Sequence, residues 1–442
     1  MIKLAYYLSA FNNFINLQRN LHISKLDLIN HQNKHLCKII KHAYETVPLY
    51  RKKFDAAGVK PENIQTAHDL AKLPCITKNE IRQNPKDSIS TKYSMDKLRM
   101  LSTSGSTGHP LKIYITKKED AYRKAKHLRA NFNCGHKPFD KWLTVTSPSH
   151  FSEVSGFQRT LRLYSPKFVS VFWDAKKQLS AINNYRPYVL DGYSSSLAIL
   201  AREIKKTGDL RQAPQIIFGG AELCDESSRK VIEESFRAPF YDQYATIEFE
   251  RMAWQCPAKD GYHIDADSMI LQFIDSNGEE VSAGESGQIV CTSLFNYAMP
   301  LIRYVVGDYG TYSDEKCSCG RTLPLLSKIE GRSDALLSLP DGRILSPRTI
   351  TITMGRFPLN KFIEQFKVIQ KQKDVLEIQL KMGDSPEAQK LVENGVIEKD
   401  VIAHYQYHLG IVNQEVRFEI RFVSEIPIGK NGKLKIVESK II

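Results

Sequence analysis

Apolar positions recur every three or four residues over residues 1 to about 90, and this spacing predicts helices. The segment KLDLINHQNKHLCKIIKHAYETVPLY, residues 25–50, keeps the period over its whole length. The first residues, MIKLAYYLSAFNNFINL, are apolar in patches interrupted by asparagines. They lack a small-residue cleavage pattern, which favours an amphipathic helix over a signal peptide.

Beyond a run of serine, threonine and glycine near residue 105, short apolar runs alternate with helical periods. Each run of four to eight apolar or β-branched residues predicts a strand, and the acidic residue at Asp225 predicts the start of a helix. Strands that alternate with helices indicate a layered α/β domain with parallel strands. The predicted strands are KWLTVTS (141–147), KFVSVFWD (167–174), APQIIFGGAEL (213–223) and APFYDQY (238–244). The segment RPYVLDGYSSSLAILAREIKKTGDL (186–210) predicts a strand, a turn and a helix, and DESSRKVIEESF (225–236) predicts a helix.

The pattern changes twice more toward the C-terminus. Residues 262–312 are rich in predicted strands, with turns at DSNGEE and SAGESG. After Gly331 a hairpin (334–345), two alternating strands (375–383 and 415–423) and a helical segment between them (385–409) form a small α+β unit. We therefore predict a large α/β domain over 1–331 and a small α+β domain over 332–442.

Composition narrows the class of protein. The 442 residues carry a net charge of +13, but the positive residues are spread along the chain, so a nucleic-acid-binding role would rest on net charge alone. No apolar run approaches the roughly 18 residues that span a bilayer. Eight cysteines in a chain of this length are too few for a disulfide scaffold. We expect a cytoplasmic protein without a membrane span, without a nucleic-acid partner, and present as a monomer or a homodimer.

The segment LSTSGSTGHPLKIYIT, residues 101–116, is the first candidate for chemistry. A glycine-rich run with hydroxyl side chains can bend sharply and bring backbone N–H groups and hydroxyls to an anion. The run lacks the spacing and the lysine of a Walker-type loop. Taken on its own, the run is more typical of a surface linker than of a binding loop. The candidate phosphate-binding residues are Ser104, Gly105, Ser106, Thr107 and Gly108.

Further motifs follow in a fixed order, and together they resemble the adenylate-forming enzymes. They are YATIE (244–248), PLIRYVVGD (300–308), EGRSD (330–334) and NGKLK (431–435). HAYETVPLYRKKFDAAGV (42–59) and CSCGR (317–321) resemble the phenylacetate–CoA ligase branch in particular, including its capsule-biosynthesis-type relatives. The resemblance covers nearly the whole chain.

The resemblance implies an ATP- and Mg²⁺-dependent ligase that forms an acyl-adenylate from a small carboxylic acid and passes the acyl group to CoA. Such a site must stabilise charge on the phosphate oxygens of ATP. The segment FGGAE resembles the family's adenine-edge segment, which assigns Gly219, Gly220, Ala221 and Glu222 to the nucleotide. By the same resemblance Tyr244 lies against adenine, Glu248 holds Mg²⁺, Asp308 binds the ribose hydroxyls, and Arg332 contacts ribose or phosphate.

Two features bear on catalysis. The family usually has Thr or Ser before the glutamate, but here Ile247 stands there, so Thr246 is the candidate for the missing hydroxyl. In EIPIGKNGKLKIVESK, Lys433 matches the family's catalytic lysine after a glycine, although Lys430 and Lys435 are close by. A mobile positive charge there would neutralise charge that builds on the α-phosphate.

Four residues form a second constellation: Cys256, His263, Cys317 and Cys319. Three thiolates and one imidazole would make a closed, tetrahedral structural zinc site. The spacing is looser than that of a standard zinc knuckle. Relatives in the branch carry a similar set, which implies Zn²⁺ as a structural cofactor.

Two alternatives to CoA ligation stay open. The activated acyl or aminoacyl group could pass to an amine or hydroxyl of a cell-surface sugar precursor, as in polysaccharide biosynthesis. Alternatively, Ile247 could mark a catalytically weak nucleotide-binding homologue. The acid itself is not determined by the sequence, although Phe151, Tyr193 and Phe218 are candidates for its pocket.

Overall fold

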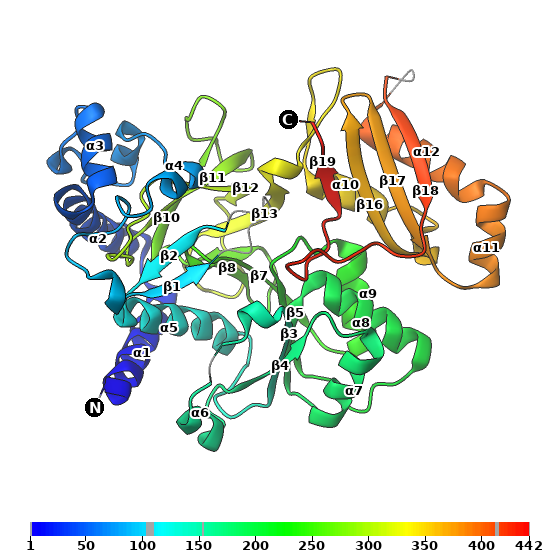
Figure 1. Cartoon of the computed structure of the whole chain (residues 1–442), viewed down its shortest axis with the longest axis horizontal. Helices are drawn as coiled ribbons and strands as arrows, with labels where there is room; N and C mark the ends of the chain where they lie inside the picture. The colour runs from blue at the N-terminus through cyan, green and yellow to red at the C-terminus, as the bar shows by residue number, and fades with distance from the viewer. Residues whose placement is uncertain (1, 103–109, 153, 412–414, 442) are drawn as a thin grey trace. The chain divides into compact units, whose positions relative to one another are not determined.

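The computed structural model describes residues 2–102, 110–152, 154–411 and 415–441. The chain forms two compact units, each built from segments that are distant in sequence (Figure 1). Unit 1 comprises Met1–Gly135 and Gln243–Ile329, and unit 2 comprises His136–Asp242 and Glu330–Ile442.

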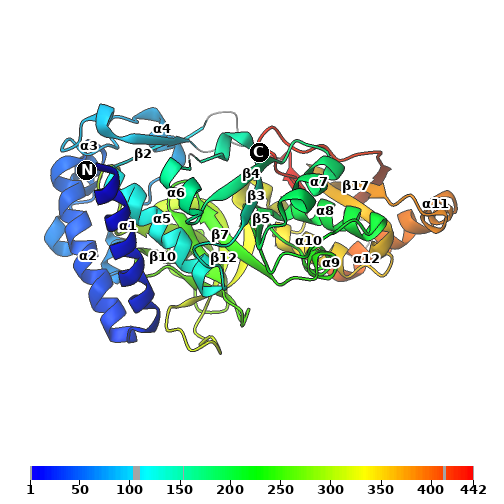
Figure 2. The ribbon, with the colours of Figure 1, turned by 90° about the horizontal axis from the view of Figure 1, so that it is seen from below.

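The N-terminal part of unit 1 is helical, as the apolar period predicted. The side chain of Ser24 accepts a hydrogen bond from the Asp27 N–H and begins the second helix. The α-helices are α1 (Ile2–Arg19), α2 (Lys25–Thr46), α3 (Pro48–Ala56), α4 (Lys78–Gln83) and α5 (Lys117–Asn133). Short 3₁₀ turns lie at Asn20–His22, Pro61–Asn63, His68–Lys72 and Met95–Lys97. Helix α5 packs along α1, as Figure 2 shows.

The C-terminal part of unit 1 is a largely antiparallel sheet. Its strands follow the order β10-β11-β12-β13-β9-β8-β7. The predicted turns at 275–280 and 282–287 lie on the connection from β10 to β11. The strands are β7 (Phe240–Thr246), β8 (Glu250–Gln255), β9 (Tyr262–Ile264), β10 (Met269–Ile274), β11 (Ser286–Ser293), β12 (Tyr304–Ser313) and β13 (Leu325–Arg332). A separate antiparallel pair consists of β1 (Arg99–Ser102) and β2 (Lys112–Ile115).

The first part of unit 2 contains the predicted parallel strands. They are β3 (Trp142–Thr146), β4 (Pro166–Ser170), β5 (Val189–Tyr193) and β6 (Ile216–Gly220), in the order β6-β5-β3-β4. The connecting helices are α6 (Gly156–Leu161), α7 (Ala175–Tyr185), α8 (Ser194–Thr207) and α9 (Glu226–Phe236), with a 3₁₀ turn at Pro148–His150. Asp225 caps α9 by accepting from the Ser228 N–H, as predicted. Buried aliphatic residues of α7 and α8 pack on the strands and form one core.

The C-terminal part of unit 2 is a four-stranded sheet in the order β18-β17-β16-β19. Its strands are β16 (Ile363–Gln372), β17 (Val375–Met382), β18 (Arg417–Phe422) and β19 (Val437–Ser439). The predicted hairpin forms between β14 (Leu337–Ser338) and β15 (Ile344–Leu345). The helices are α10 (Pro347–Gly355), α11 (Pro386–Glu393) and α12 (Val396–Leu409), with 3₁₀ turns at Ser333–Ala335 and Asn360–Phe362.

The segment 385–409 is helical, as predicted. Its helices α11 and α12 are separated at Gly395, which takes a left-handed conformation with φ of 66°. Residues of α10 and α12 then pack against β16 and β17 in a second core.

Candidate active site and metal centre

The carboxyl ends of the parallel strands in unit 2 carry several of the predicted site residues. Ligands of open α/β sheets bind at this edge. Strand β6 ends in Gly219 and Gly220, and Ala221 follows with φ of 66°. Gly219 is required for packing, since a Cβ there would lie 2.1 Å from the Phe240 ring. The adenine role of residues 219–222 stays a prediction.

The side chain of Glu222 is already engaged by backbone donors. Its Oε2 accepts from the Ser195 N–H at 3.0 Å, and its Oε1 accepts from the Leu434 N–H at 2.5 Å. Burial raises the pKa of Glu222 above its usual value, although these N–H groups and the nearby Lys433 charge oppose the shift.

The segment 429–434 forms the tight turn that the Asn-Gly pair predicted. The Gly432 N–H donates to the Gly429 carbonyl at 2.8 Å, and the Lys433 N–H donates to Asn431 Oδ1 at 3.1 Å. Gly432 has φ of 80°, and a Cβ there would lie 2.4 Å from Val171 Cγ1. The Lys433 ammonium lies 5.7 Å from the centre of the Tyr193 ring.

Burial distinguishes the three lysines near this turn. Lys433 is half-buried, whereas Lys430 and Lys435 are exposed. The structure therefore favours Lys433 as the lysine that is presented on the carboxyl edge of the sheet.

Unit 1 brings together two predicted nucleotide-binding residues. The Tyr244 hydroxyl donates to Asp308 Oδ2 at 2.8 Å, and both side chains are buried. Tyr244 comes from β7 and Asp308 from β12, so residues 64 positions apart meet. Each carboxylate oxygen can accept more than one hydrogen bond, so a carboxylate at this position is a suitable acceptor for further hydroxyl groups.

The turn after β7 carries Thr246, Ile247 and Glu248. Glu248 is buried, and its Oε1 accepts from the Tyr304 hydroxyl at 2.9 Å and lies 3.6 Å from Lys78 Nζ. The Thr246 hydroxyl accepts from the Phe249 N–H at 3.2 Å and is thus part of the turn itself. Glu250 follows with φ of 64°.

Helix α5 supports this turn with a row of basic side chains. Arg123 donates to the carbonyls of Ile247 at 2.8 Å and Glu248 at 3.2 Å. Lys126 donates to the Phe249 carbonyl at 2.9 Å. Both basic side chains are buried, and their positive charges hold three successive carbonyls of the turn.

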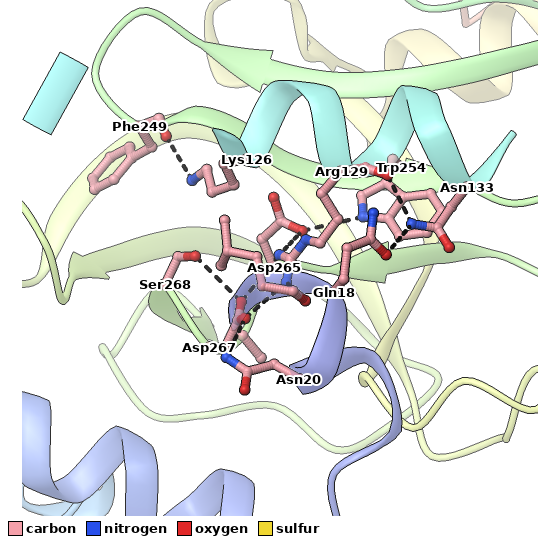
Figure 3. Close-up of polar contacts among 12 residues, drawn as sticks. Gln18, Asn20, Lys126, Arg129, Asn133, Phe249, Trp254, Asp265, Asp267 and Ser268 are labelled. Atoms are coloured by element: carbon pink, nitrogen blue, oxygen red, sulfur yellow. Dashed lines mark hydrogen bonds and ion pairs between the residues drawn. The ribbon is translucent and has the colours of Figure 1, made fainter. Parts of the chain in front are cut away.

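Figure 3 shows Lys126 together with the neighbouring ion pair of the same helix. Arg129 is fully buried and pairs with Asp265 and with Asp267, whose Oδ2 lies 2.7 Å from Arg129 Nη1. Asp267 also accepts from Asn20, and Asp265 accepts from the Trp254 indole at 3.1 Å. Sequence reasoning missed these contacts, although Arg123, Lys126 and Arg129 stand at a regular spacing of three residues.

The four residues of the predicted metal site come together in unit 1. The ligand atoms of Cys256, His263, Cys317 and Cys319 all lie within 4.8 Å of one another. Cys256 Sγ is 3.5 Å from Cys317 Sγ, and Cys319 Sγ is 3.3 Å from His263 Nε2. Burial lowers the pKa of His263 to about 4, so the ring is in its neutral, ligating form at pH 7. Three sulfur atoms and one nitrogen, from three buried residues and the half-buried Cys319, fit zinc.

Arg332 and the glycine-rich run are the remaining residues that were predicted to bind the nucleotide. Arg332 pairs with Asp334 at 3.4 Å, and both side chains are exposed. The phosphate-binding candidates Ser104, Gly105, Ser106, Thr107 and Gly108 lie outside the described residues.

Comparison with known proteins identifies the family. No protein-family model matches the chain. The phenylacetate–coenzyme A ligase of Escherichia coli is 30% identical over 318 residues, which cover 69% of this chain and 71% of that enzyme. The chain belongs to the phenylacetate–coenzyme A ligase family.

Other relatives and a solved structure match most of the chain. The phenylacetate–coenzyme A ligase of Thermus thermophilus is 25% identical over 386 residues, covering 84% of this chain and 86% of that enzyme. The protein CapK of Staphylococcus aureus is 24% identical over 445 residues, covering 94% of this chain and 90% of CapK. A solved 2-hydroxyisobutyryl-CoA ligase in complex with 2-HIB-AMP has a TM-score of 0.81 at 19% identity, covering 96% of this chain and 92% of that one, and shows the fold.

Membership of the phenylacetate–coenzyme A ligase family confirms the predicted fold class and enzyme class. The chain is an ATP-dependent, AMP-forming acid–CoA ligase, which forms an acyl-adenylate before transfer to CoA. Among the described residues, none of the helices combines the length and the apolar character that crossing a bilayer requires.

Proposed function

We propose that this enzyme activates a small aryl carboxylic acid, of the class that phenylacetate represents, and transfers it to CoA. The observation that carries the acid class is the 30% identity with a phenylacetate–coenzyme A ligase. Aromatic side chains at the carboxyl edge of the unit 2 sheet support it. Phe151 stacks on Phe168 with ring centres 5.0 Å apart, and the Tyr193 hydroxyl lies 2.8 Å from His150 Nδ1.

Phe218 does not belong to this aromatic surface. Its side chain is fully buried in strand β6 and contacts Tyr241, with ring centres 6.1 Å apart. Phe151, in contrast, is 42% exposed, so its ring is accessible to a flat substrate. Tyr193 is also buried, but its hydroxyl reaches His150 at the carboxyl edge of the sheet. We therefore assign Phe151 and Tyr193, and not Phe218, to recognition of the acid.

In the proposed nucleotide site, Asp308 accepts the ribose hydroxyls and Tyr244 lies against adenine. Their mutual hydrogen bond fixes the carboxylate and the ring before ATP arrives, which lowers the entropic cost of binding. Residues 104–108 contact the β- and γ-phosphates, residues 219–222 the adenine edge, and Arg332 the ribose or phosphate. These roles follow from the positions of the residues in the family's motifs.

For catalysis, Lys433 neutralises the charge that develops as the acid attacks the α-phosphate and pyrophosphate leaves. Glu248 offers a hard carboxylate oxygen, the ligand type that Mg²⁺ prefers. Bound there, Mg²⁺ would neutralise phosphate charge. Thr246 supplies a hydroxyl next to this glutamate, in place of the one that Ile247 lacks. Residues 332–442 form the mobile small domain in this proposal.

A structural zinc ion held by Cys256, His263, Cys317 and Cys319 completes the proposal. The site joins the end of β8, strand β9 and the segment that precedes β13. With four protein ligands it leaves no position for water, so its role is to stabilise the fold.

A pyrophosphate-release screen over aryl, fatty and amino acids, each with and without CoA, tests the function. We expect release with arylacetic acids, formation of the aryl-CoA thioester, and little release with long fatty acids. Release with fatty or amino acids only would contradict the acid class.

The likeness to CapK over 94% of the chain favours a second candidate, in which the acceptor is an amine or hydroxyl of a sugar precursor. Adenylate formation that is followed by acyl transfer to such acceptors, and not to CoA, would favour this candidate. Nucleotide binding without pyrophosphate release for any acid would favour the binding homologue.

A further inference from the structure

Glu222 connects two segments of unit 2 that are more than two hundred residues apart in sequence. It follows β6 at the carboxyl edge of the parallel sheet. Its Oε2 accepts from the Ser195 N–H, in the first turn of the fourteen-residue helix α8. The N-terminus of a helix favours a negative charge, so this contact holds the carboxylate in one orientation.

The second oxygen of Glu222 binds the turn that presents the candidate catalytic lysine. It accepts from the Leu434 N–H at 2.5 Å, directly after Lys433. Gly432 fits against the same edge so closely that an added Cβ would lie 2.4 Å from Val171 and 3.2 Å from the Tyr193 ring. We call the segment 429–434 the lysine turn. It is held by a hydrogen bond to Glu222, which follows β6, and by close packing on Val171, which follows β4, and on Tyr193 of β5.

We propose that Glu222 is a positioning residue that docks the lysine turn on the carboxyl edge of the sheet and so places the Lys433 ammonium for adenylation. The inference rests on the proposed function of Lys433. The positioning role is additional to the adenine contact proposed for residues 219–222, because it rests on the two carboxylate oxygens of Glu222, each of which accepts from a backbone N–H group.

A carboxylate suits this task better than a neutral side chain. Hydrogen bonds to an ionised acceptor are roughly twice as strong as neutral ones. Glutamine has nearly the same shape, but its NH₂ group would face one of the two N–H donors and could not accept from it. The lysine turn donates such a bond from the Leu434 N–H. This bond holds the turn during adenylation, and it can break when the small domain moves.

The experiment compares the full-length Glu222→Gln variant with the parent enzyme. Hydrogen exchange of the Leu434 amide reports docking directly and needs no substrate. We expect this amide to exchange about tenfold faster or more in the variant. ATP–pyrophosphate exchange should show a kcat that is lower by about tenfold, with KM for ATP unchanged. Thioester formation from supplied acyl-adenylate should keep the parent rate.

Two further variants keep the test decisive. Glu226→Gln alters an exposed glutamate on α9 and should change neither exchange nor kinetics. Gly432→Ala disturbs the seat from the side of the lysine turn and should reproduce the Glu222→Gln pattern, including when Glu222→Gln itself folds poorly.

Unchanged exchange at Leu434 in both Glu222→Gln and Gly432→Ala would overturn the docking. Faster exchange with an unchanged adenylation rate would overturn the positioning role. If the parent enzyme adenylates no acid, the proposed function fails, whereas the Leu434 exchange still supports or refutes docking.

Discussion

Lys433 is the residue on which the proposed adenylation step depends most directly. Its ammonium lies over the Tyr193 ring, and the flanking lysines are exposed. We expect Lys433→Ala to lower the rate of adenylate formation about 10²–10³-fold while ATP still binds, because one preorganised charge is lost. Pyrophosphate release and calorimetric ATP titration measure the two effects. Lys430→Ala is the matched control, and a loss of rate there instead of at Lys433 would show that Lys430 is the catalytic residue.

Asp308 carries the second prediction at this scale. We expect Asp308→Ala to weaken ATP binding by more than about tenfold, since the ribose hydroxyls would lose a charged acceptor that contributes about 1.5–3 kcal/mol per bond. Tyr244→Phe removes only the hydroxyl that donates to Asp308 and leaves the carboxylate in place, so its effect should be smaller. Isothermal calorimetry separates the two variants. Equal ATP affinity of Asp308→Ala and the parent enzyme would contradict the ribose assignment.

The role of an individual residue could be predicted from the sequence only where the residue belongs to a recognisable motif. The Cys256, His263, Cys317 and Cys319 set was predicted from residue types and resemblance, and the fold brings the four together. The contacts of Glu248 with Tyr304 and Lys78 could not be predicted, because no local pattern joins residues so far apart. The same holds for the Glu222 contact with Leu434.

Helix α5 is the element whose burial is most unusual. Arg123, Lys126 and Arg129 point into the unit 1 interior, where a helix normally places apolar side chains. For this reason the apolar period gave no prediction of α5. The parallel strands β3 to β6 of unit 2, in contrast, were predicted at the correct places because each is a short apolar run. Strand β16 was missed, since its sequence IEQFKVIQKQ mixes polar residues into both faces.

The buried Lys126 makes a pH prediction possible for this element. Burial lowers the pKa of Lys126 to about 8, whereas a lysine in the unfolded chain has a pKa of about 10.4. Between these values the unfolded chain binds one proton more than the folded protein, so the stability of the folded protein rises with pH. Below pH 8 both states are protonated, and the cost of the buried charge is fully present.

We therefore expect the free energy of unfolding of the parent, relative to Lys126→Met, to rise between pH 8 and about 10. This difference in unfolding free energy should rise by no more than about 1.4 kcal/mol per pH unit, the value for one proton. Urea unfolding of both proteins at several pH values gives this difference, and titrations elsewhere cancel in it. Lys124→Met, which alters an exposed lysine of the same helix, should show no such slope. A flat difference for Lys126→Met would mean that this lysine titrates normally.

At the scale of the whole chain, each compact unit joins an early and a late part of the sequence. Hydrophobic patterning predicted the order of the elements and the α/β class, because both follow from local periods. It did not predict which distant segments would share a unit, because that depends on tertiary contacts. The domain boundary at 331/332, with a mobile small domain over 332–442, stays a prediction.

One zinc ion bound by Cys256, His263, Cys317 and Cys319 should affect the stability of the whole of unit 1. Its ligands come from two segments on either side of a long β-rich stretch, so a bound ion would cross-link the sheet of unit 1. Metal that binds only the folded state stabilises it. We expect one zinc per chain by elemental analysis. Removal by a strong chelator should lower the melting temperature on the order of 10 °C.

Two variants separate this effect from a general response to the loss of a cysteine. Cys317→Ser with Cys319→Ser should lose the metal and melt at the temperature of the chelated parent. Cys37→Ser, at a half-buried thiol of helix α2 outside the site, should keep one zinc and the parent melting temperature. Chelation of the double variant should then have no further effect, because no site remains. Metal-free parent protein, or a double variant that melts with the untreated parent, would show that the four residues pack together without an ion.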